Sequence, residues 1–194
     1  MQEDISELKV SYAFRNLMIE DIMSPSADEN TQSYEYEART YYFKTDVLNS
    51  LDAAISRQTQ GGTIVTASVI SIKKEGFDEL YYPEINMDTG AAFYAVNTGD
   101  MEGELYLEAF VSFMSERYNG TNSNYGMIGK WTVGNEVNES GTYNYMGEQR
   151  LEDYIKEYTR TFRIVYNIIK SNIPNADVYI PMEPWWKIES GMLT

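Results

Sequence analysis

The chain has 194 residues, of which 43% are hydrophobic and 14% aromatic, enough to bury a sizeable core as one domain over residues 1–194 or as part of one. Thirty acidic against fifteen basic residues give a formal charge of −15, which argues against nucleic acid and anionic membranes as partners. Cys and His are both absent, which excludes disulfides, a thiol nucleophile, a Ser-His-Asp triad and a His-based zinc site.

The first part of the chain predicts two strands separated by a hairpin and a helix. Residues 10–19 have the pattern of a buried strand. Residues 34–43 alternate and are rich in Tyr, which predicts a small hairpin on the surface or over the site. Residues 46–59 predict a helix that a Gly-Gly pair closes. The β-branched run at 63–70 is typical of a strand covered on both faces.

A long connection and a second helix follow. Residues 73–100 are too many for an ordinary connection, so we expect a functional loop. Residues 102–118 predict a helix whose apolar stripe faces the core. Residues 130–135 predict the next strand.

The last predicted elements are a long helix and a short strand. Apolar residues at helical spacing over 151–169, Leu151 and Ile155 among them, predict an amphipathic helix that stops near Pro174. Residues 178–180 predict the final strand. Strand and helix therefore alternate along most of the chain, which indicates a parallel sheet.

The segment Trp131-Thr-Val-Gly-Asn-Glu carries the strongest functional signal. It ends a predicted buried strand in Asn135-Glu136, and a carboxylate at the carboxyl end of a strand is where a barrel hydrolase keeps its proton donor. Gly134 allows close approach of the backbone, and the Asn135 amide can hydrogen-bond a sugar hydroxyl. The plainer alternative is that Glu136 caps the turn or pairs with an arginine. We predict that Glu136 is a general acid/base.

Gly134-Asn135-Glu136 resembles the fourth strand of the clan of retaining (β/α)8 glycoside hydrolases, in which the Asn-Glu pair binds the sugar and supplies the acid/base. A longer resemblance rests on the segments 93–98, 108–118, 134–138 and 145–147. Together these segments, from about Ile5 to Trp186, resemble a family of barrel proteins catalogued as a domain of unknown function and related to glycoside hydrolases. The chain departs from that pattern at 181–186, where a more polar strand end is expected.

These observations lead to an expected fold of the parallel (β/α) TIM-barrel type. A doubly wound sheet is the other architecture with this alternation, but no Gly-rich phosphate loop follows any predicted strand. A full barrel needs roughly 250 residues, so we expect an incomplete barrel with about strands two to five, a fragment. The resemblance implies a nucleophile on the seventh strand, so the isolated chain is expected to lack it.

Glu183 is the internal candidate to partner Glu136, because it follows the neighbouring predicted strand. Adjacent strands lie about 4.8 Å apart, so carboxyls at their ends can come within catalytic range, although a substrate-binding role at the rim is the more ordinary one. Trp185 and Trp186 offer a stacking platform for a sugar ring or an apolar edge. Two carboxylates suffice for this chemistry, so no metal or organic cofactor is implied.

The predicted function is therefore hydrolysis of an O-glycosidic bond, with a carbohydrate as partner. The alternative is a non-catalytic carbohydrate-binding or interaction module that lacks a complete carboxylate pair. Unpaired barrel edges predict a homodimer. No apolar segment follows Met1 and none has the length of a membrane span, so we expect a soluble chain without its own export signal, while a longer form could be secreted.

Overall fold

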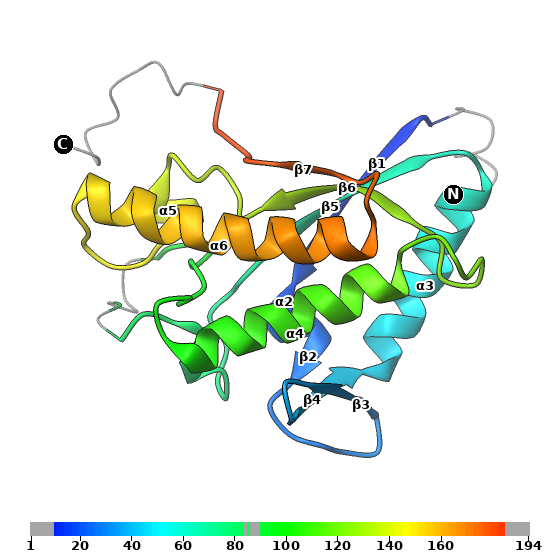
Figure 1. The fold of residues 1–194 in the computed structure, drawn as a ribbon, viewed down its shortest axis with the longest axis horizontal. Helices are drawn as coiled ribbons and strands as arrows, with labels where there is room; N and C mark the ends of the chain where they lie inside the picture. The colour runs from blue at the N-terminus through cyan, green and yellow to red at the C-terminus, as the bar shows by residue number, and fades with distance from the viewer. Residues whose placement is uncertain (1–9, 84, 86–89, 185–194) are drawn as a thin grey trace.

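The computed structural model describes residues 10–83, 85 and 90–184, which form two sheets and the helices that pack on them (Figure 1). The larger sheet has four parallel strands in the order β1-β5-β6-β7. Its strands are β1 (Tyr12–Met18), β5 (Ile64–Ile70), β6 (Ile128–Val133) and β7 (Asp177–Tyr179).

Three long helices connect these strands, and a smaller antiparallel sheet with order β2-β4-β3 lies beyond them. The long helices are α3 (Thr45–Gln60), α4 (Met101–Arg117) and α6 (Leu151–Asn172). The small sheet comprises β2 (Met23–Ser24), β3 (Thr31–Tyr36) and β4 (Arg39–Lys44). The short helical turns are α2 (Ile19–Ile22), η1 (Asp78–Leu80) and α5 (Ser140–Tyr143).

The predicted alternation of strands and helices is confirmed, and most elements begin and end within two residues of the prediction. The hairpin is also confirmed, as β3 and β4. Its two turn residues, Glu37 and Ala38, have φ of 47° and 60°, the left-handed pair that lets a two-residue turn follow the twist of the strands. Periodicity located α3 and α6 because each buries one stripe, whereas β5 was located by its continuous β-branched run and is buried over most of its length.

The predicted (β/α) TIM-type barrel, whole or as strands two to five, is wrong. The four parallel strands form an open sheet in which the described β1 pairs only with β5 and β7 only with β6, so no closure is present. A separate antiparallel sheet joins it, which makes the fold a mixed α/β fold. Strand-helix alternation in the sequence cannot distinguish an open parallel sheet from a closed barrel, because both repeat the same strand-helix unit.

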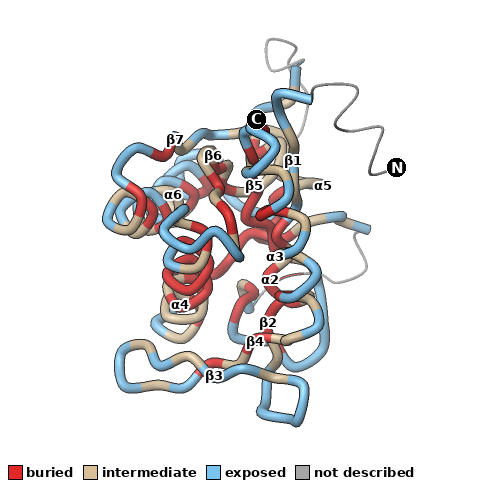
Figure 2. The backbone as a smooth tube through the Cα atoms, turned by 90° about the vertical axis from the view of Figure 1, so that its right-hand side faces the viewer, coloured by how far each residue is buried: buried red, intermediate tan, exposed pale blue. Residues whose placement is uncertain are grey.

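The core lies between the large sheet and the helices. The register puts Ala67, Trp131 and Val178 in one row across the sheet, and Trp131 is fully buried on the side that the helices cover. In Figure 2 the buried residues run along β5, β6 and the inner sides of the helices. Phe43 of the small sheet stacks on Phe113 of α4 at 3.8 Å between ring centroids, which joins both sheets into one core.

Three residues of the predicted apolar stripe of α6 lie outside the core. Leu151, Ile155 and Tyr166 are exposed, whereas Tyr154, Tyr158 and Val165 are buried. The helix therefore turns a narrower stripe to the sheet than its sequence indicates. Within the described residues, no helix combines the length and apolar composition needed to cross a bilayer.

Candidate functional site

The carboxyl ends of the four parallel strands meet at one edge of the large sheet, where open α/β sheets bind ligands. Each strand delivers a polar side chain within a few residues of this edge. These residues are Glu20 after β1, Ser71 after β5, Glu136 after β6 and Glu183 after β7. The predicted placement of Glu136 and Glu183 after adjacent strands is confirmed by the parallel pairing of β6 with β7.

The turn after β6 has an unusual backbone. Gly134 has φ of 79° and Glu136 has φ of 41°, a region that non-glycine residues seldom adopt. A side chain at position 134 would bring its Cβ within 3.0 Å of Val137 Cγ1 and 3.1 Å of Asn144 Oδ1, so glycine is required there. Strain of the kind at Glu136 costs about 1–3 kcal/mol and persists only where the surroundings impose it.

Two tyrosines of α6 impose this turn. The Tyr158 hydroxyl donates to the carbonyl of Val133 at 2.9 Å, and the Tyr154 hydroxyl donates to the carbonyl of Val137 at 2.5 Å. The two rings stack at 6.4 Å with an interplanar angle of 5°. Both ends of the segment that carries Glu136 are therefore fixed to the helix that follows it in the chain.

The sheet itself holds the start of the turn. Gly134 donates its N–H to the carbonyl of Val69 at 2.9 Å, and Ser68 Oγ donates to the Gly134 carbonyl at 2.7 Å. The side chains of Asn135 and Glu136 are only partly buried, and within the described ranges neither forms a hydrogen bond or an ion pair. The backbone of this turn is therefore held in place. It presents the Asn135 amide and the Glu136 carboxylate, which have no hydrogen-bond partner among the described residues.

Asn138 joins this turn to the end of β7. Its Oδ1 accepts the backbone N–H of Glu183 at 2.8 Å, and its Nδ2 donates to Glu183 Oε2 at 3.3 Å. Val137 donates its N–H to the Pro181 carbonyl at 3.1 Å, so the two strand ends run side by side. The structure therefore brings the segments of Glu136 and Glu183 together. The predicted platform residues Trp185 and Trp186 lie outside the described residues.

A small cavity lies beside this turn, under the long 73–100 segment. Its volume is about 20 Å³, and its lining comes mainly from residues 93–96, the segment 143–146 and the ends of β5 and β6, with Gly134 among them. That volume accommodates about one water molecule, far less than the several hundred Å³ of an ordinary ligand pocket. Across the part of the chain that is described, no three carboxylates gather to hold a metal ion.

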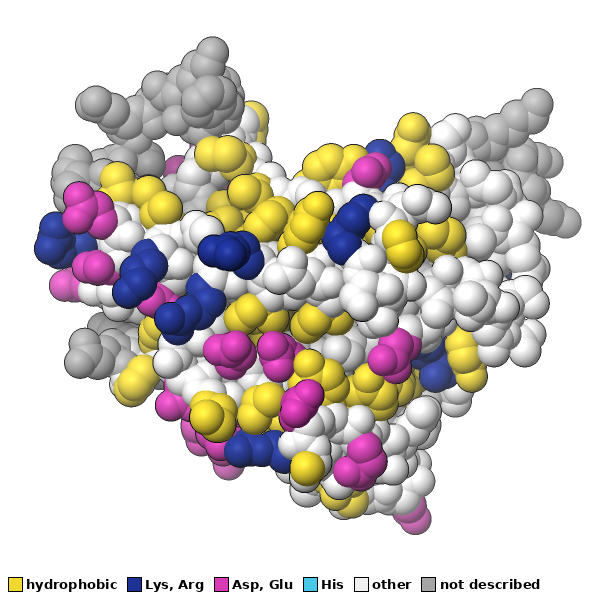
Figure 3. All heavy atoms as spheres, viewed as in Figure 1, with side chains coloured by type: hydrophobic (Ala, Val, Ile, Leu, Met, Phe, Trp, Pro, Cys, Tyr) yellow, Lys and Arg dark blue, Asp and Glu magenta, His cyan; other side chains and the backbone are white. Residues whose placement is uncertain are grey.

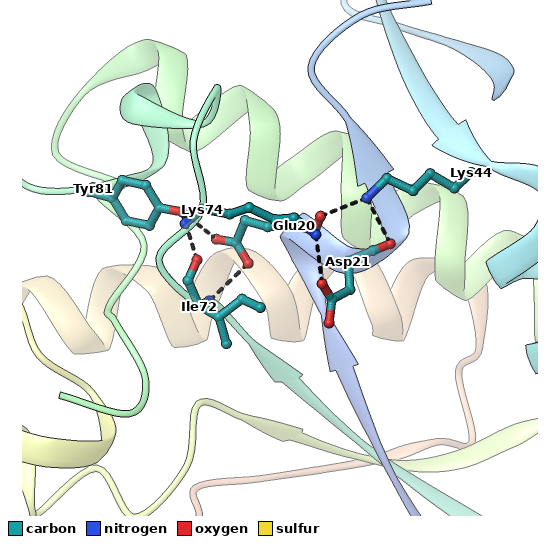
Figure 4. A network of polar contacts seen from close by, with 6 residues as sticks. All are labelled: Glu20, Asp21, Lys44, Ile72, Lys74 and Tyr81. Carbon is teal, nitrogen blue, oxygen red and sulfur yellow. Dashed lines mark hydrogen bonds and ion pairs between the residues drawn. The ribbon is translucent and has the colours of Figure 1, made fainter. Parts of the chain in front are cut away.

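Glu20 is a second carboxylate at this edge, and it is fully buried (Figure 4). Ser71 Oγ donates to its Oε1 at 2.5 Å, the Ile72 N–H donates to its Oε2 at 2.9 Å, and the Tyr81 hydroxyl lies 3.1 Å from Oε1. Desolvation by burial raises the pKa of Glu20 above its ordinary value of 4.5, while these hydrogen bonds lower it. The hydrogen bonds of Glu20 connect the end of β1 to the segment that follows β5.

The raised pKa of Glu20 predicts a pH-dependent contribution to stability. The folded state binds this proton more tightly than the unfolded state, so the contribution is complete below the unfolded pKa and is lost as pH rises through the folded pKa. We expect the free energy of unfolding of the wild type, relative to Glu20→Gln, to fall as pH rises above the ordinary pKa of about 4.5. Urea denaturation of both proteins at matched pH checks this, and a constant difference would contradict it.

Removing the Tyr154 hydroxyl should loosen the turn that carries Glu136. Tyr154→Phe leaves the buried Val137 carbonyl and the Asn144 amide without their partner, so we expect a loss of about 1–3 kcal/mol in the free energy of unfolding. Tyr166→Phe is the matched control, because Tyr166 lies exposed on the same helix and should change stability by less than about 0.5 kcal/mol. Equal losses in denaturant titrations would rule out the proposed role of the Tyr154 hydroxyl.

Sequence reasoning missed the residues that position this site. The spacing of Tyr154 and Tyr158 indicates only that they belong to the apolar stripe of this helix. Both are buried, however, and a buried tyrosine hydroxyl requires a hydrogen-bond acceptor. Glu20 follows a strand directly, the same pattern that singled out Glu136, and could have been found by it. Asn138 had no signal in the sequence, because its contact with Glu183 spans 45 residues.

Comparison with known proteins gives one match. The family model described as "Family of unknown function (DUF5722)" covers residues 1–193. No curated protein and no solved structure matches the chain. This match confirms the prediction that the chain resembles a family catalogued as a domain of unknown function.

Proposed function

We propose a function for this chain, which belongs to the family of unknown function DUF5722, from the chemistry of its site. The carboxyl edge of the parallel sheet is a carbohydrate site at which an O-glycosidic bond is hydrolysed. Glu136 is the general acid/base of this reaction, and Asn135 hydrogen-bonds a hydroxyl of the sugar beside the scissile bond.

The conformation of Glu136 is the observation that carries this proposal. Its φ of 41° is strained, and the tyrosines of α6 hold the turn at both ends. Strained backbone that the surroundings maintain clusters at active sites, where it aims a side chain.

Two carboxyl groups are enough for glycoside hydrolysis. As general acid, Glu136 protonates the oxygen of the departing sugar, and a second carboxylate either attacks the anomeric carbon or activates a water molecule that does so. Glu183 is the candidate for that second group, because Asn138 holds it on the neighbouring strand end. Nucleophilic attack retains the anomeric configuration and direct attack by water inverts it, so NMR of the first product identifies which role Glu183 has.

Charge and composition favour neutral sugars over acidic ones. The chain carries a formal charge of −15, which repels uronic acids and sulfated glycans. Its 17 tyrosines and 3 tryptophans include side chains suited to stacking on the apolar faces of sugar rings.

A carbohydrate-binding module without turnover is the second candidate function. Glu183 Oε2 already accepts a hydrogen bond from the Asn138 amide, which commits part of this carboxylate to holding the strand end. If Glu183 is only structural, the edge keeps Asn135 and Glu136 as sugar-binding groups but has no complete catalytic pair.

The two functions separate in a paired assay of the purified chain. We expect saturable hydrolysis of at least one member of a panel of aryl glycosides and neutral oligosaccharides. Saturable binding on a glycan array without release of the aryl group would select the binding module. A chain that neither hydrolyses nor binds neutral glycans would refute both functions.

A further inference from the structure

One face of the parallel sheet has no helices over it in the described part of the chain. The register sets Tyr12 beside Ile64 on this face and Phe14 in a row with Thr66 and Lys130. Tyr12 is 63% exposed and Phe14 is 59% exposed, whereas the opposite face packs against the helices. Parallel sheets are ordinarily covered on both faces.

Several of the exposed hydrophobic side chains lie on this face. Of the eleven large hydrophobic residues exposed among those described, the strand register places four on it: Tyr12, Phe14, Ile64 and Tyr179. In Figure 3, hydrophobic side chains gather along the upper margin of the molecule, over β7 and β1. Four exposed hydrophobic residues on one uncovered sheet face indicate an interaction site, because single exposed hydrophobic residues are scattered on ordinary surfaces.

The charge of this face points to the kind of partner. Its charged residues, Lys130 and Asp177, pair with each other at 3.7 Å, so the face is neutral although the chain carries −15. Lys130 also lies 5.9 Å from the ring of Tyr12 and 5.5 Å from that of Tyr179, which holds its ammonium group against the face. Two copies that meet at this face avoid the mutual repulsion that every acidic surface of the chain would produce.

We propose that a second copy of this chain packs against the bare sheet face, so that the two parallel sheets stack face to face. The contact is isologous, since the same patch serves on both copies, and stacked sheets interdigitate their side chains at about 10 Å separation. The sheet edge that carries Glu136 is not part of this contact. The inference is therefore independent of the proposed function.

The size of the face indicates a weak contact. Four strands of three to seven residues, about 4.8 Å apart and about 3.3 Å per residue, cover roughly 400 Å² on each copy. Roughly 800 Å² in total falls below the 1,200 Å² at which stable interfaces begin, so we expect a dimer that dissociates reversibly.

Sedimentation velocity over a range of concentrations tests this proposal. We expect the wild-type chain to pass reversibly from monomer to dimer, and Phe14→Glu to weaken the association at least about tenfold by placing a carboxylate in each apolar face. Ile155→Glu is the matched control, because Ile155 is 53% exposed on α6, away from the sheet face. It should dimerise like the wild type. Circular dichroism confirms that each variant is folded, and Tyr179→Glu replaces Phe14→Glu if that variant is not.

Three results would overturn the proposal. A wild-type chain that stays monomeric at the highest concentration has no second copy on this face, whatever else the face binds. Equal weakening by Ile155→Glu and Phe14→Glu would place the contact elsewhere or make it nonspecific. Assemblies larger than a dimer that form without a dimer step would show open-ended association instead of a closed pair.

Discussion

Replacing Glu136 by Gln should lower kcat/KM for a hydrolysed glycoside by about 10²–10⁴-fold, the usual contribution of a general acid or base. Glutamine has nearly the same shape, but it cannot deliver a proton. Because the backbone of the turn is held by Tyr154, Tyr158 and the sheet, the substitution should leave the fold unchanged. Steady-state kinetics of both proteins measures the loss.

The dependence on the leaving group distinguishes proton donation from a structural effect. Aryl groups that depart readily as anions need little protonation, so the loss at Glu136→Gln should shrink with them and grow with alkyl or sugar leaving groups. Glu139→Gln is the matched control, since it changes a partly buried carboxylate of the same loop and should keep nearly full activity. A loss of equal size for all leaving groups, or for Glu139→Gln, would remove Glu136 from the acid/base role.

Replacing Asp52 by Ala should lower the free energy of unfolding by about 3–5 kcal/mol, the cost of leaving a buried charge without its partner. Asp52 of α3 accepts from Arg117 Nε at 2.8 Å and Nη2 at 2.5 Å, and from the Tyr118 hydroxyl at 2.9 Å. The Asp52 and Arg117 side chains are only 13% and 11% exposed, so solvent cannot replace these contacts. Chemical denaturation of the variant and the wild type measures the difference.

The pair between Arg39 and Glu102 supplies the comparison for Asp52. It is also bidentate, but its side chains are 39% and 45% exposed, and surface pairs contribute about 0–1 kcal/mol. Glu102→Ala should therefore cost less than about 1 kcal/mol. If the two substitutions destabilise the protein equally, burial does not govern the contribution of these ion pairs.

Local pattern was sufficient to place the candidate acid/base. The β-type residues of Trp131 to Val133 and the break at Gly134 put Glu136 just beyond a strand, and the structure has β6 end at Val133. This worked because strand ends are set by nearest neighbours in the chain: apolar residues pair in the sheet, and glycine with positive φ stops the pairing. The strain at Glu136 itself had no local signal, since distant tyrosine hydroxyls impose it.

Taken alone, the amino-acid sequence determined the order of the elements, their approximate bounds and the edge of the sheet at which Glu136 and Glu183 stand. Each of these follows from periodicity within one element and from the common direction of parallel strands. Tertiary structure alone decided that the sheet is open, that the helices leave one face bare, and that Leu151 and Ile155 of α6 stay in solvent. It also decided the burial of Glu20 and the contact of Asn138 with Glu183. The physical reason is range: these features depend on which surfaces meet across tens of residues, and a repeating local pattern is compatible with several such arrangements.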